Sequence, residues 1–288
     1  MKKLAILIMT VLTAVFMLSS CAENEQPPQK IRTQVSEDLI VYSFSLGKAD
    51  AHLIYNSQFA VLIDCGEKGQ GKEILDYMEE NDIPSLDYLI ITHFDKDHVG
   101  GAAKILKAGV VKNVLCSNYP KESEEYSSYR EQLSKQGLEA VTVRESYRFS
   151  LGGAEFMADP PRAAEYPTDP SNNSSLIVSL FYGENALLFA GDAEDLRLAE
   201  FTAANEFDYD YLKVPYHGHF QERLREFLPD VRAESAVITS SDKEPEDSRT
   251  VELLENSGAE VFLTRTAAVR AVCDGRTVKV SYDVPQGS

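Results

Sequence analysis

Strand-like apolar runs recur along most of this chain, and many of them are continuous rather than alternating with polar residues. They are rich in Val, Ile, Leu, Tyr and Phe. They occupy residues 38–46, 51–55, 59–64, 88–92, 111–116, 140–145, 154–158, 175–182, 186–191, 211–215, 235–240, 259–264 and 276–282. Because a continuous apolar strand is typical of a sheet covered on both faces, the chain is predicted to bury its sheets between other layers.

Helical periodicity separates several of these runs. It fits residues 72–81, 102–108, 123–137, 193–204, 221–228 and 250–258. Gly109, Gly137 and Gly258 stand where helix C-terminal caps are expected.

The order of these elements indicates two similar halves. A hairpin-rich opening leads into strand–helix alternation up to residue 137, and a second hairpin-rich set from residue 140 leads into another alternation. This order predicts an α/β protein in which two mixed β-sheets pack face to face and are flanked by helices, a four-layer αββα sandwich. Residues 241–288 are expected to complete the second half with a helix and terminal strands.

The N-terminus has a different character. Residues 1–21 carry two lysines and an apolar stretch from 4 to about 18, and they end in "LSSC". This is the layout of a secretory signal peptide, and its end resembles the lipobox of bacterial lipoproteins, in which the cysteine, here Cys21, carries the lipid. The apolar stretch is shorter than the ~20 residues of a transmembrane helix. Residues 22–37 are polar and predict a flexible tether, and 38–288 predict the globular domain, lipid-anchored outside the cytoplasm of a bacterial cell.

Charge and cysteine content restrict the partners. Lys and Arg number 28 against 46 Asp and Glu, giving a formal net charge of −18, which disfavours tight binding of duplex DNA. A polyanionic substrate would have to be attracted by local charge, chiefly that of a bound metal. Cys65, Cys116 and Cys273 are an odd set at wide spacing, so we interpret them as core residues rather than a disulfide framework. The oligomeric state is left open.

The stretch "THFDKDHVGG" at 92–101 concentrates possible metal ligands. His93, Asp95, Asp97 and His98 fall within six positions, after an apolar strand and before a predicted helix. Imidazole and carboxylate groups suit zinc, manganese or iron, and the end of a strand is where α/β sheets place functional groups. The four side chains can divide between two ions. Taken alone, the stretch fits an exposed charged turn equally well.

Two distant stretches favour the metal interpretation. Asp192 follows the strand-like run of "NALLFAGDAED", and His217 follows that of "DYLKVPYHGHF". Each residue alone has an ordinary explanation, a helix N-cap for Asp192 and a surface position for His217. Three strand ends with metal-binding side chains in one domain are harder to attribute to chance.

Together these stretches resemble the metallo-β-lactamase superfamily, and more narrowly the extracytoplasmic domain of ComEC-type DNA-uptake proteins. Members of that branch have "THxDxDHxGG", with Asp where lactamases have a second His. Further similarity lies in "LGKADAHLI" (46–54), "VLIDCG" (61–66), "NNSSLIVSL" (172–180), "LLFAGDAE" (187–194) and "LKVPYHG" (212–218). The resemblance covers residues 38–240 in order.

The resemblance implies one or two divalent ions, zinc or manganese, and a role for each matching residue. The first ion would be held by His93 and Asp95, and the second by Asp97, His98 and His217. Asp192 would bridge the two ions. Asp97 and Asp192 are the implied catalytic carboxylates, and Asp97 would also orient a water whose pKa the ions lower.

The surrounding residues receive weaker assignments. Asp64 is expected to order the motif loop, and Asp50 to support the site or face the substrate. Tyr216 replaces the first His of the "HHG" pattern, and His219 replaces a Ser; both are either proton donors to the leaving group or ordinary loop residues.

One histidine of the lactamases has no counterpart here. There is no histidine between His98 and His217, so the first site would either bind its ion weakly or take an oxygen from Asn172 or Asn173.

These features predict a surface-anchored, metal-dependent hydrolase that cleaves a phosphodiester in a nucleic acid, a nucleotide or an envelope polymer. One alternative is a non-catalytic metal-binding lipoprotein that uses the fold as a scaffold. Another is a β-lactam hydrolase, which Asp95 and the missing histidine disfavour.

Overall fold

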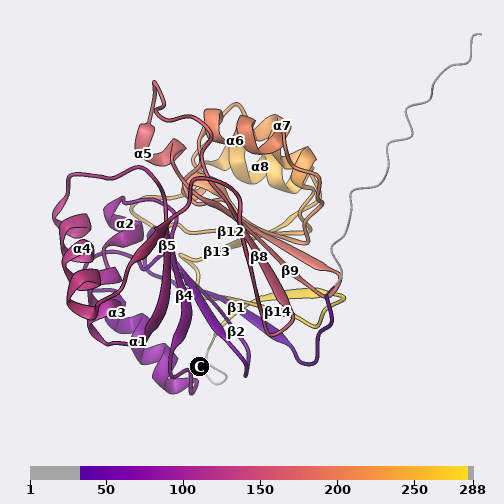
Figure 1. Ribbon diagram of the computed structural model, residues 1–288. Coiled ribbons are helices and arrows are strands. Elements are labelled where there is room, and N and C mark those ends of the chain that lie inside the picture. The colour runs from indigo at the N-terminus through magenta and orange to yellow at the C-terminus, as the bar shows by residue number, and fades with distance from the viewer. Residues whose placement is uncertain (1–32, 285–288) are drawn as a thin grey trace, which may run out of the picture.

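The computed structural model describes residues 33–284, which form two β-sheets packed face to face (Figure 1). The first sheet holds eight strands in the order β15 (Val278–Tyr282), β14 (Val269–Cys273), β1 (Leu39–Ser43), β2 (His52–Tyr55), β3 (Ala60–Ile63), β4 (Leu86–Ile91), β5 (Val111–Cys116) and β6 (Ala140–Thr142). The second holds seven, in the order β13 (Glu260–Leu263), β12 (Ser235–Ile238), β11 (Tyr211–Lys213), β10 (Asn185–Phe189), β9 (Ile177–Tyr182), β8 (Ala154–Asp159) and β7 (Tyr147–Leu151).

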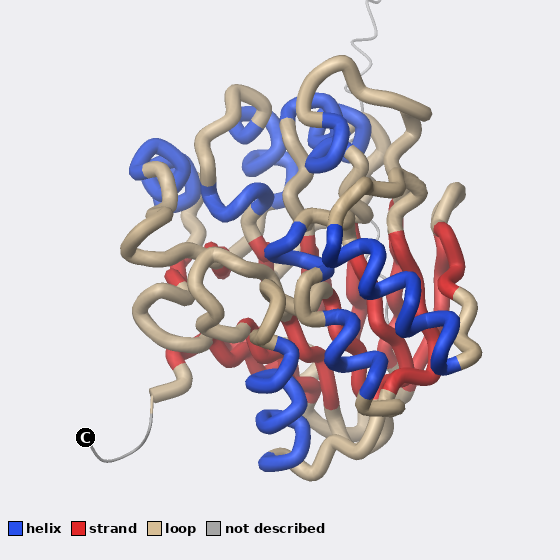
Figure 2. The backbone as a smooth tube through the Cα atoms, turned by 90° about the vertical axis from the view of Figure 1, so that its left-hand side faces the viewer, coloured by secondary structure: helices blue, strands red, loops and turns tan. Residues whose placement is uncertain are grey.

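Helices cover the outer face of each sheet (Figure 2). On the first sheet lie α1 (Gly71–Glu80), α2 (Lys96–Val99), α3 (Ala102–Lys107) and α4 (Glu124–Gln136). On the second lie α6 (Asp195–Thr202), α7 (Leu224–Val231) and α8 (Ser248–Asn256), while α5 (Pro170–Asn173) and the 3-10 helix η1 (Pro215–Gly218) are short turns in the connections. The predicted four-layer αββα sandwich is confirmed.

Three apolar cores hold the layers together. Leu39, Val41 and Ile54 of the first sheet pack against Phe156 and Val178 of the second. The other two cores lie between each sheet and its helices. Since strands such as β3 and β9 contribute side chains to a core on either face, their sequences are almost entirely apolar, with Ser179 of β9 the exception.

Both sheets are mixed. Strands β3 to β6 run parallel, as do β10 to β13, whereas the remaining neighbours are antiparallel. The loops that follow β3, β4, β10, β11 and β12 carry the side chains of the site described below. Parallel strands bring their carboxyl ends to one edge of a sheet, and this topology gathers residues that are more than a hundred positions apart in the sequence.

The C-terminal hairpin departs from the predicted organisation. We expected the terminal strands to complete the second half, but β14 pairs with β1 and β15 pairs with β14, so both extend the first sheet. Val269, Ala271 and Cys273 of β14 are buried in the core between the sheets. This pairing covers the edge of β1 that would otherwise be open.

The beginning of the described chain lies against the domain. Glu37 accepts a hydrogen bond from the Tyr182 hydroxyl through its backbone oxygen (2.6 Å). The Thr33 hydroxyl accepts one from the Gly183 amide (2.7 Å). Residues 33–37, which we assigned to the tether, therefore contact the β9–β10 hairpin. The predicted signal peptide (1–21), Cys21 and the rest of the tether lie outside the described residues.

Candidate metal centre

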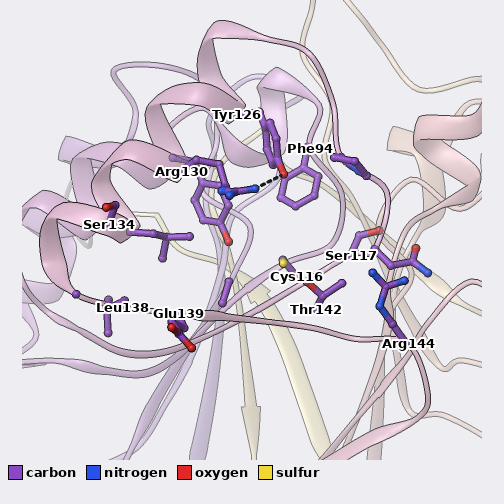
Figure 3. A pocket seen from close by; sticks show the side chains of 16 residues that line it. Phe94, Cys116, Ser117, Tyr126, Arg130, Ser134, Leu138, Glu139, Thr142 and Arg144 are labelled. Atoms are coloured by element: carbon purple, nitrogen blue, oxygen red, sulfur yellow. Dashed lines mark hydrogen bonds between the residues drawn. The ribbon is translucent and has the colours of Figure 1, made fainter.

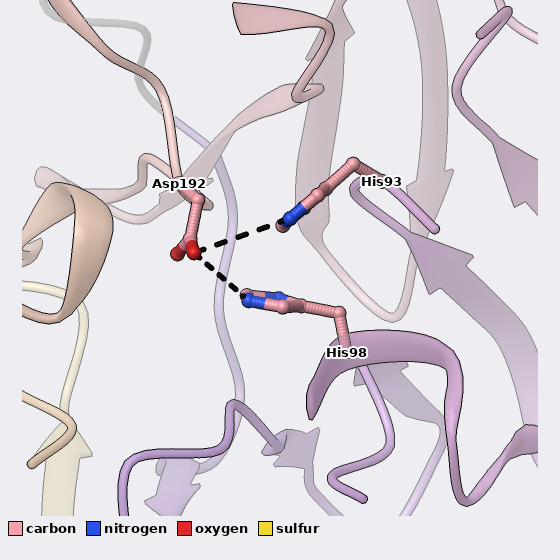
Figure 4. Close-up of side chains that lie close together, drawn as sticks. All are labelled: His93, His98 and Asp192. Atoms are coloured by element: carbon pink, nitrogen blue, oxygen red, sulfur yellow. Dashed lines mark ion pairs between the residues drawn. The ribbon is translucent and has the colours of Figure 1, made fainter. Parts of the chain in front are cut away.

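Three histidines and two aspartates from distant loops meet at the edge shared by the two sheets. His93 follows β4, His98 lies in α2, and His217 lies in η1. Asp97 also belongs to α2, and Asp192 follows β10. All five side chains are buried. Figure 4 shows the imidazoles of His93 and His98 pointing toward the carboxylate of Asp192.

Asp192 lies at the centre of this cluster. Its Oδ2 atom is 3.0 Å from Nε2 of His217 and 3.2 Å from Nε2 of His98. The same oxygen is 4.0 Å from Nε2 of His93. Asp97 approaches from one side, with Oδ2 3.5 Å from Nε2 of His217. One carboxylate oxygen thus faces all three histidines, which is the arrangement required of a ligand shared between two ions.

The Nδ1 atoms of the three histidines, which do not face Asp192, contact hydroxyl and carboxylate groups. His98 donates from Nδ1 to Oδ2 of Asp64 (2.8 Å). His93 lies with Nδ1 3.1 Å from the Thr92 hydroxyl, which itself donates to Asp64 (2.7 Å). Because the Thr92 hydroxyl proton is already donated to Asp64, Nδ1 of His93 must donate to the hydroxyl oxygen. Nε2 of His93 therefore keeps a free lone pair.

His217 is held in the same way. Its Nδ1 atom lies 3.1 Å from the Thr239 hydroxyl, which donates to Oδ1 of Asp50 (2.5 Å). In all three histidines Nδ1 therefore carries a proton, Nε2 is the nitrogen that faces Asp192, and no hydrogen bond to Nε2 is found among the described residues. Buried nitrogens without partners, aimed at one carboxylate, fit a metal ion, because ligating imidazoles are oriented through their other nitrogen.

The electrostatics of the cluster favour a bound cation. Burial alone would lower the pKa of His217, but Asp192, Asp50 and Asp97 raise it to about 10. Burial also opposes protonation of His98, yet Asp192, Asp64 and Asp50 raise its pKa well above the ordinary value. Burial and the neighbouring His98 lower the pKa of His93 to about 4. The carboxylates thus create a negative potential that a divalent ion would satisfy.

Four groups of ligand atoms are each compact enough to hold one ion. They are His93, His98 and Asp192; Asp97, His98 and His217; Asp50, Asp192 and His217; and Asp50, Asp64 and His98. Asp95 belongs to none of them. Its Oδ1 atom lies 3.8 Å from Nε2 of His93, but Lys121 and Ser171 both donate to that oxygen.

Asp64 ties the motif loop to β3. It accepts hydrogen bonds from the Thr92 amide (2.9 Å), from the Thr92 hydroxyl and from His98. Its φ of 57° is strained for a residue with a side chain. Gly101, at the end of the same motif, could not carry a side chain, because a Cβ atom would lie 2.1 Å from the Cys65 carbonyl oxygen.

The loop that carries His217 is also strained. Tyr216 and His217 have φ values of 47° and 50°, in the left-handed region that non-glycine residues rarely adopt. The Tyr216 amide donates to the Gly191 carbonyl (3.2 Å), which holds this loop beside Asp192. His219 packs its ring against Tyr216, with the ring centroids 4.8 Å apart.

The two asparagines that were predicted to complete the first site differ in their contacts. Asn173 is buried, with its amide donating to the Thr168 carbonyl (3.0 Å) and its oxygen accepting from the Arg197 amide (3.0 Å). Asn172 donates to Glu194 (2.7 Å), whose pKa is raised to about 7, mainly by burial. The Asn173 oxygen is thus already engaged by Arg197, and the role of Asn172 as a ligand of the first site stays a prediction.

Lys213 and Asp50 form a buried ion pair behind the cluster. Lys213 also donates to the Gly191 carbonyl (3.0 Å) and lies 3.7 Å from Oδ1 of Asp192. Burial would raise the pKa of Asp50, but Lys213 and His98 bring it well below the usual value. Lys213 was not predicted to belong to the site. Its position inside the otherwise apolar strand-like run 211–215 was the signal that it had to have a charged partner.

Arg197 is a second buried cation that the sequence did not reveal. It donates to the carbonyl of Ser175 (3.1 Å) and forms an ion pair with Asp159 (2.7 Å). The Ser175 hydroxyl lies between the Asp192 amide (3.2 Å) and Nδ1 of His93 (3.4 Å). Arg197 therefore positions two members of the cluster through Ser175.

A cleft opens over the cluster. It has a volume of about 370 Å³, and Lys48, Lys121, Asn172, Asp192 and Tyr216 are among its lining residues. A neighbouring cavity of about 530 Å³ shares Asp95, Lys121 and Asn172 with it. A larger cavity of about 710 Å³ lies against α4 and is lined by Arg130, Arg144 and Cys116, but by none of the predicted ligands (Figure 3).

No helix within residues 33–284 is both long and apolar enough to cross a membrane.

Comparison with protein families matches residues 45–238 to the metallo-beta-lactamase superfamily. Recombination protein 2 of Haemophilus influenzae is 27% identical over 205 residues, which are 69% of this chain and 24% of that protein. ComE operon protein 3 of Bacillus subtilis is 28% identical over 178 residues, 59% of this chain and 22% of that protein. The chain thus spans about a quarter of the length of these relatives.

Solved structures share the fold at low sequence identity. The metallo-beta-lactamase fold protein YhfI from Bacillus subtilis superposes with a TM-score of 0.57 at 10% identity, covering 85% of this chain and all of YhfI (100%). CmlA, a diiron beta-hydroxylase from Streptomyces venezuelae, superposes with a TM-score of 0.55 at 17% identity, covering 83% of this chain and 54% of CmlA.

Proposed function

Because the chain belongs to the metallo-beta-lactamase superfamily, in a branch similar to ComEC-type proteins, we propose that it is a metal-dependent hydrolase that cleaves a phosphodiester. The observation that carries this proposal is the convergence of three unpartnered Nε2 atoms on the Asp192 carboxylate. His93 and Asp95 would contribute to the first divalent ion, zinc or manganese. Asp97, His98 and His217 would hold the second ion, with Asp192 between the two.

Divalent ions at such a site polarise a scissile bond and lower the pKa of bound water. The chain's own residues supply orientation and charge. Asp97 is among the residues that line the cleft, and it would orient a nucleophile there. The hydrogen bonds from Nδ1 of each histidine to Asp64, Thr92 and Thr239 fix the imidazoles, so that the site is organised before substrate arrives.

Lysines at the mouth of the cleft support an anionic substrate. Lys48 lies with Nζ 3.3 Å from Oδ2 of Asp97 and 3.4 Å from Glu244, and Lys121 also lines the cleft. The positive charge of these two ammonium groups would favour a phosphodiester in the cleft over a neutral ester. The cleft of about 370 Å³ suits a small ester or one nucleotide unit, and the net charge of −18 disfavours a long duplex.

We further propose that lipid on Cys21 anchors the protein outside the cytoplasmic membrane. The apolar stretch and the "LSSC" sequence support this. Cys21→Ala is expected to move the protein from the membrane fraction to the soluble fraction, or to leave it unprocessed. Unchanged membrane association and processing would contradict the proposed lipid anchor.

A hydrolysis panel tests the proposed function. The full chain, purified in mild detergent, is offered a chromogenic phosphodiester, single-stranded DNA, a phosphorylcholine ester and a chromogenic β-lactam, each with and without chelator. We expect chelator-sensitive cleavage of at least one phosphorus ester and none of the β-lactam. Stoichiometric metal without any turnover would instead favour a binding lipoprotein that uses the fold as a scaffold.

A further inference from the structure

The two ion positions of the proposed metal centre are built differently. At one of them, Asp192 and Asp97 approach the histidine nitrogens to between 3.0 and 3.5 Å. At the other, His93 faces Asp95 and Asp192 at 3.8 and 4.0 Å. The distances around His93 are longer, and this ion position has one histidine instead of two.

The oxygen that faces His93 is already occupied. Oδ1 of Asp95 accepts from the Lys121 ammonium group (2.5 Å) and from the Ser171 hydroxyl. An ion between His93 and this oxygen would have to displace Lys121, because an ammonium group and a divalent cation repel one another at such distances. Nε2 of His93 meanwhile has no hydrogen-bond partner among residues 33–284.

The Lys121 side chain lies where it can move away from Asp95. It lies in the loop between β5 and α4, with 35% of its side chain exposed, and Asp95 is 27% exposed. Lys121 lines both the cleft over the metal centre and the neighbouring cavity. Its ammonium group can therefore turn from Asp95 toward an anion in either space without disturbing the buried core.

We propose that Lys121 acts as an internal cation at the position of the first metal ion. Its pairing with Asp95 lowers the affinity of that position for a divalent ion. The protein therefore holds one ion tightly, between Asp97, His98 and His217, and binds another beside Asp95 only when Lys121 moves away. The inference rests on the proposed metal centre, but it does not depend on which substrate, if any, is hydrolysed.

Metal titration tests this directly. Chelator-treated full chain is titrated calorimetrically with Mn²⁺ and with Zn²⁺, and the ion content after desalting is measured by elemental analysis. Wild type should bind one ion tightly and a second at least about tenfold more weakly. Lys121→Met should tighten the second ion by about tenfold or more, and Lys121→Arg should leave it weak.

Lys96→Met is the matched control. Lys96 lines the same cleft and the same charge is removed, but its ammonium group is directed at Glu67 (3.8 Å) and its side chain is 69% exposed. The Lys96→Met variant should bind its second ion with the same affinity as wild type. The proposal fails if wild type binds two ions with equal affinity, or if Lys121→Met and Lys96→Met have the same effect. Lys121→Gln repeats the test should the Met variant unfold at a lower temperature than wild type.

Discussion

The Lys213 ammonium group forms an ion pair with the Asp50 carboxylate, and both side chains are buried directly behind the histidine cluster. Asp50 also accepts from Thr239, which in turn holds His217, so this pair connects the interior of the second sheet to the proposed ligands. The metal centre is thus supported by a buried ion pair as well as by the apolar core.

Removing Lys213 should destabilise the protein strongly. Lys213→Met leaves the Asp50 carboxylate buried without its partner, which costs about 3–5 kcal/mol of unfolding free energy. Urea unfolding of the chelator-treated protein measures this. Asp50→Asn in the same background should recover part of the loss. Lys112→Met, which breaks an exposed pair with Asp87, should cost less than about 1 kcal/mol. Equal losses for the two lysine variants would refute the role assigned to Lys213.

Asp64 should control metal affinity without binding metal. Asp64→Asn removes the carboxylate that accepts from both Thr92 and His98, so the His98 ring loses its fixed orientation. We expect affinity for Zn²⁺ to fall by about 10–100-fold, as measured by competition with a chromogenic chelator. Asp76→Asn on the surface of α1 is the control and should bind as wild type does. An Asp64→Asn protein with wild-type affinity would contradict this account.

Bound metal should stabilise the fold. At a free ion concentration of about 100 times Kd, binding adds about 2.7 kcal/mol to the free energy of unfolding. The thermal midpoint should therefore fall on treatment with chelator and return when Mn²⁺ or Zn²⁺ is added back. Asp192→Ala should unfold at the same midpoint with and without added metal. A thermal midpoint of wild type that changes neither with chelator nor with added metal would argue against a metal centre.

Much of the fold could be predicted because local patterns report it. The Ser123 hydroxyl caps α4 by accepting from the Tyr126 amide, and Gly137 ends that helix with a φ of 65°. Strand β7 was missed because its residues are only partly buried, and the short helices α2 and α5 because four residues carry no periodic signal. The pairing of β14 with β1 joins residues more than 220 positions apart, and nothing local specifies it.

The proposed ligands could be named because motifs at strand ends mark them, but their surroundings could not. Whether Asp50 faces substrate or interior depends on the second sheet supplying Lys213. Whether Asp95 is free depends on Lys121, which lies in a different loop. Such pairings are decided by tertiary packing, which places charges from separate strands side by side.

The central claim is that the carboxylate of Asp192 organises a metal centre that performs hydrolysis. The most direct measurement is the initial rate with a chromogenic phosphodiester for wild type, Asp192→Asn and Asp195→Asn, each after chelation and again after addition of Mn²⁺ or Zn²⁺. Asp195 lies three residues further on, at the exposed start of α6. Wild type and Asp195→Asn should lose activity on chelation and regain it with metal, while Asp192→Asn stays at least about 100-fold slower. Equal rates for all three proteins, unaffected by chelator, would contradict the account.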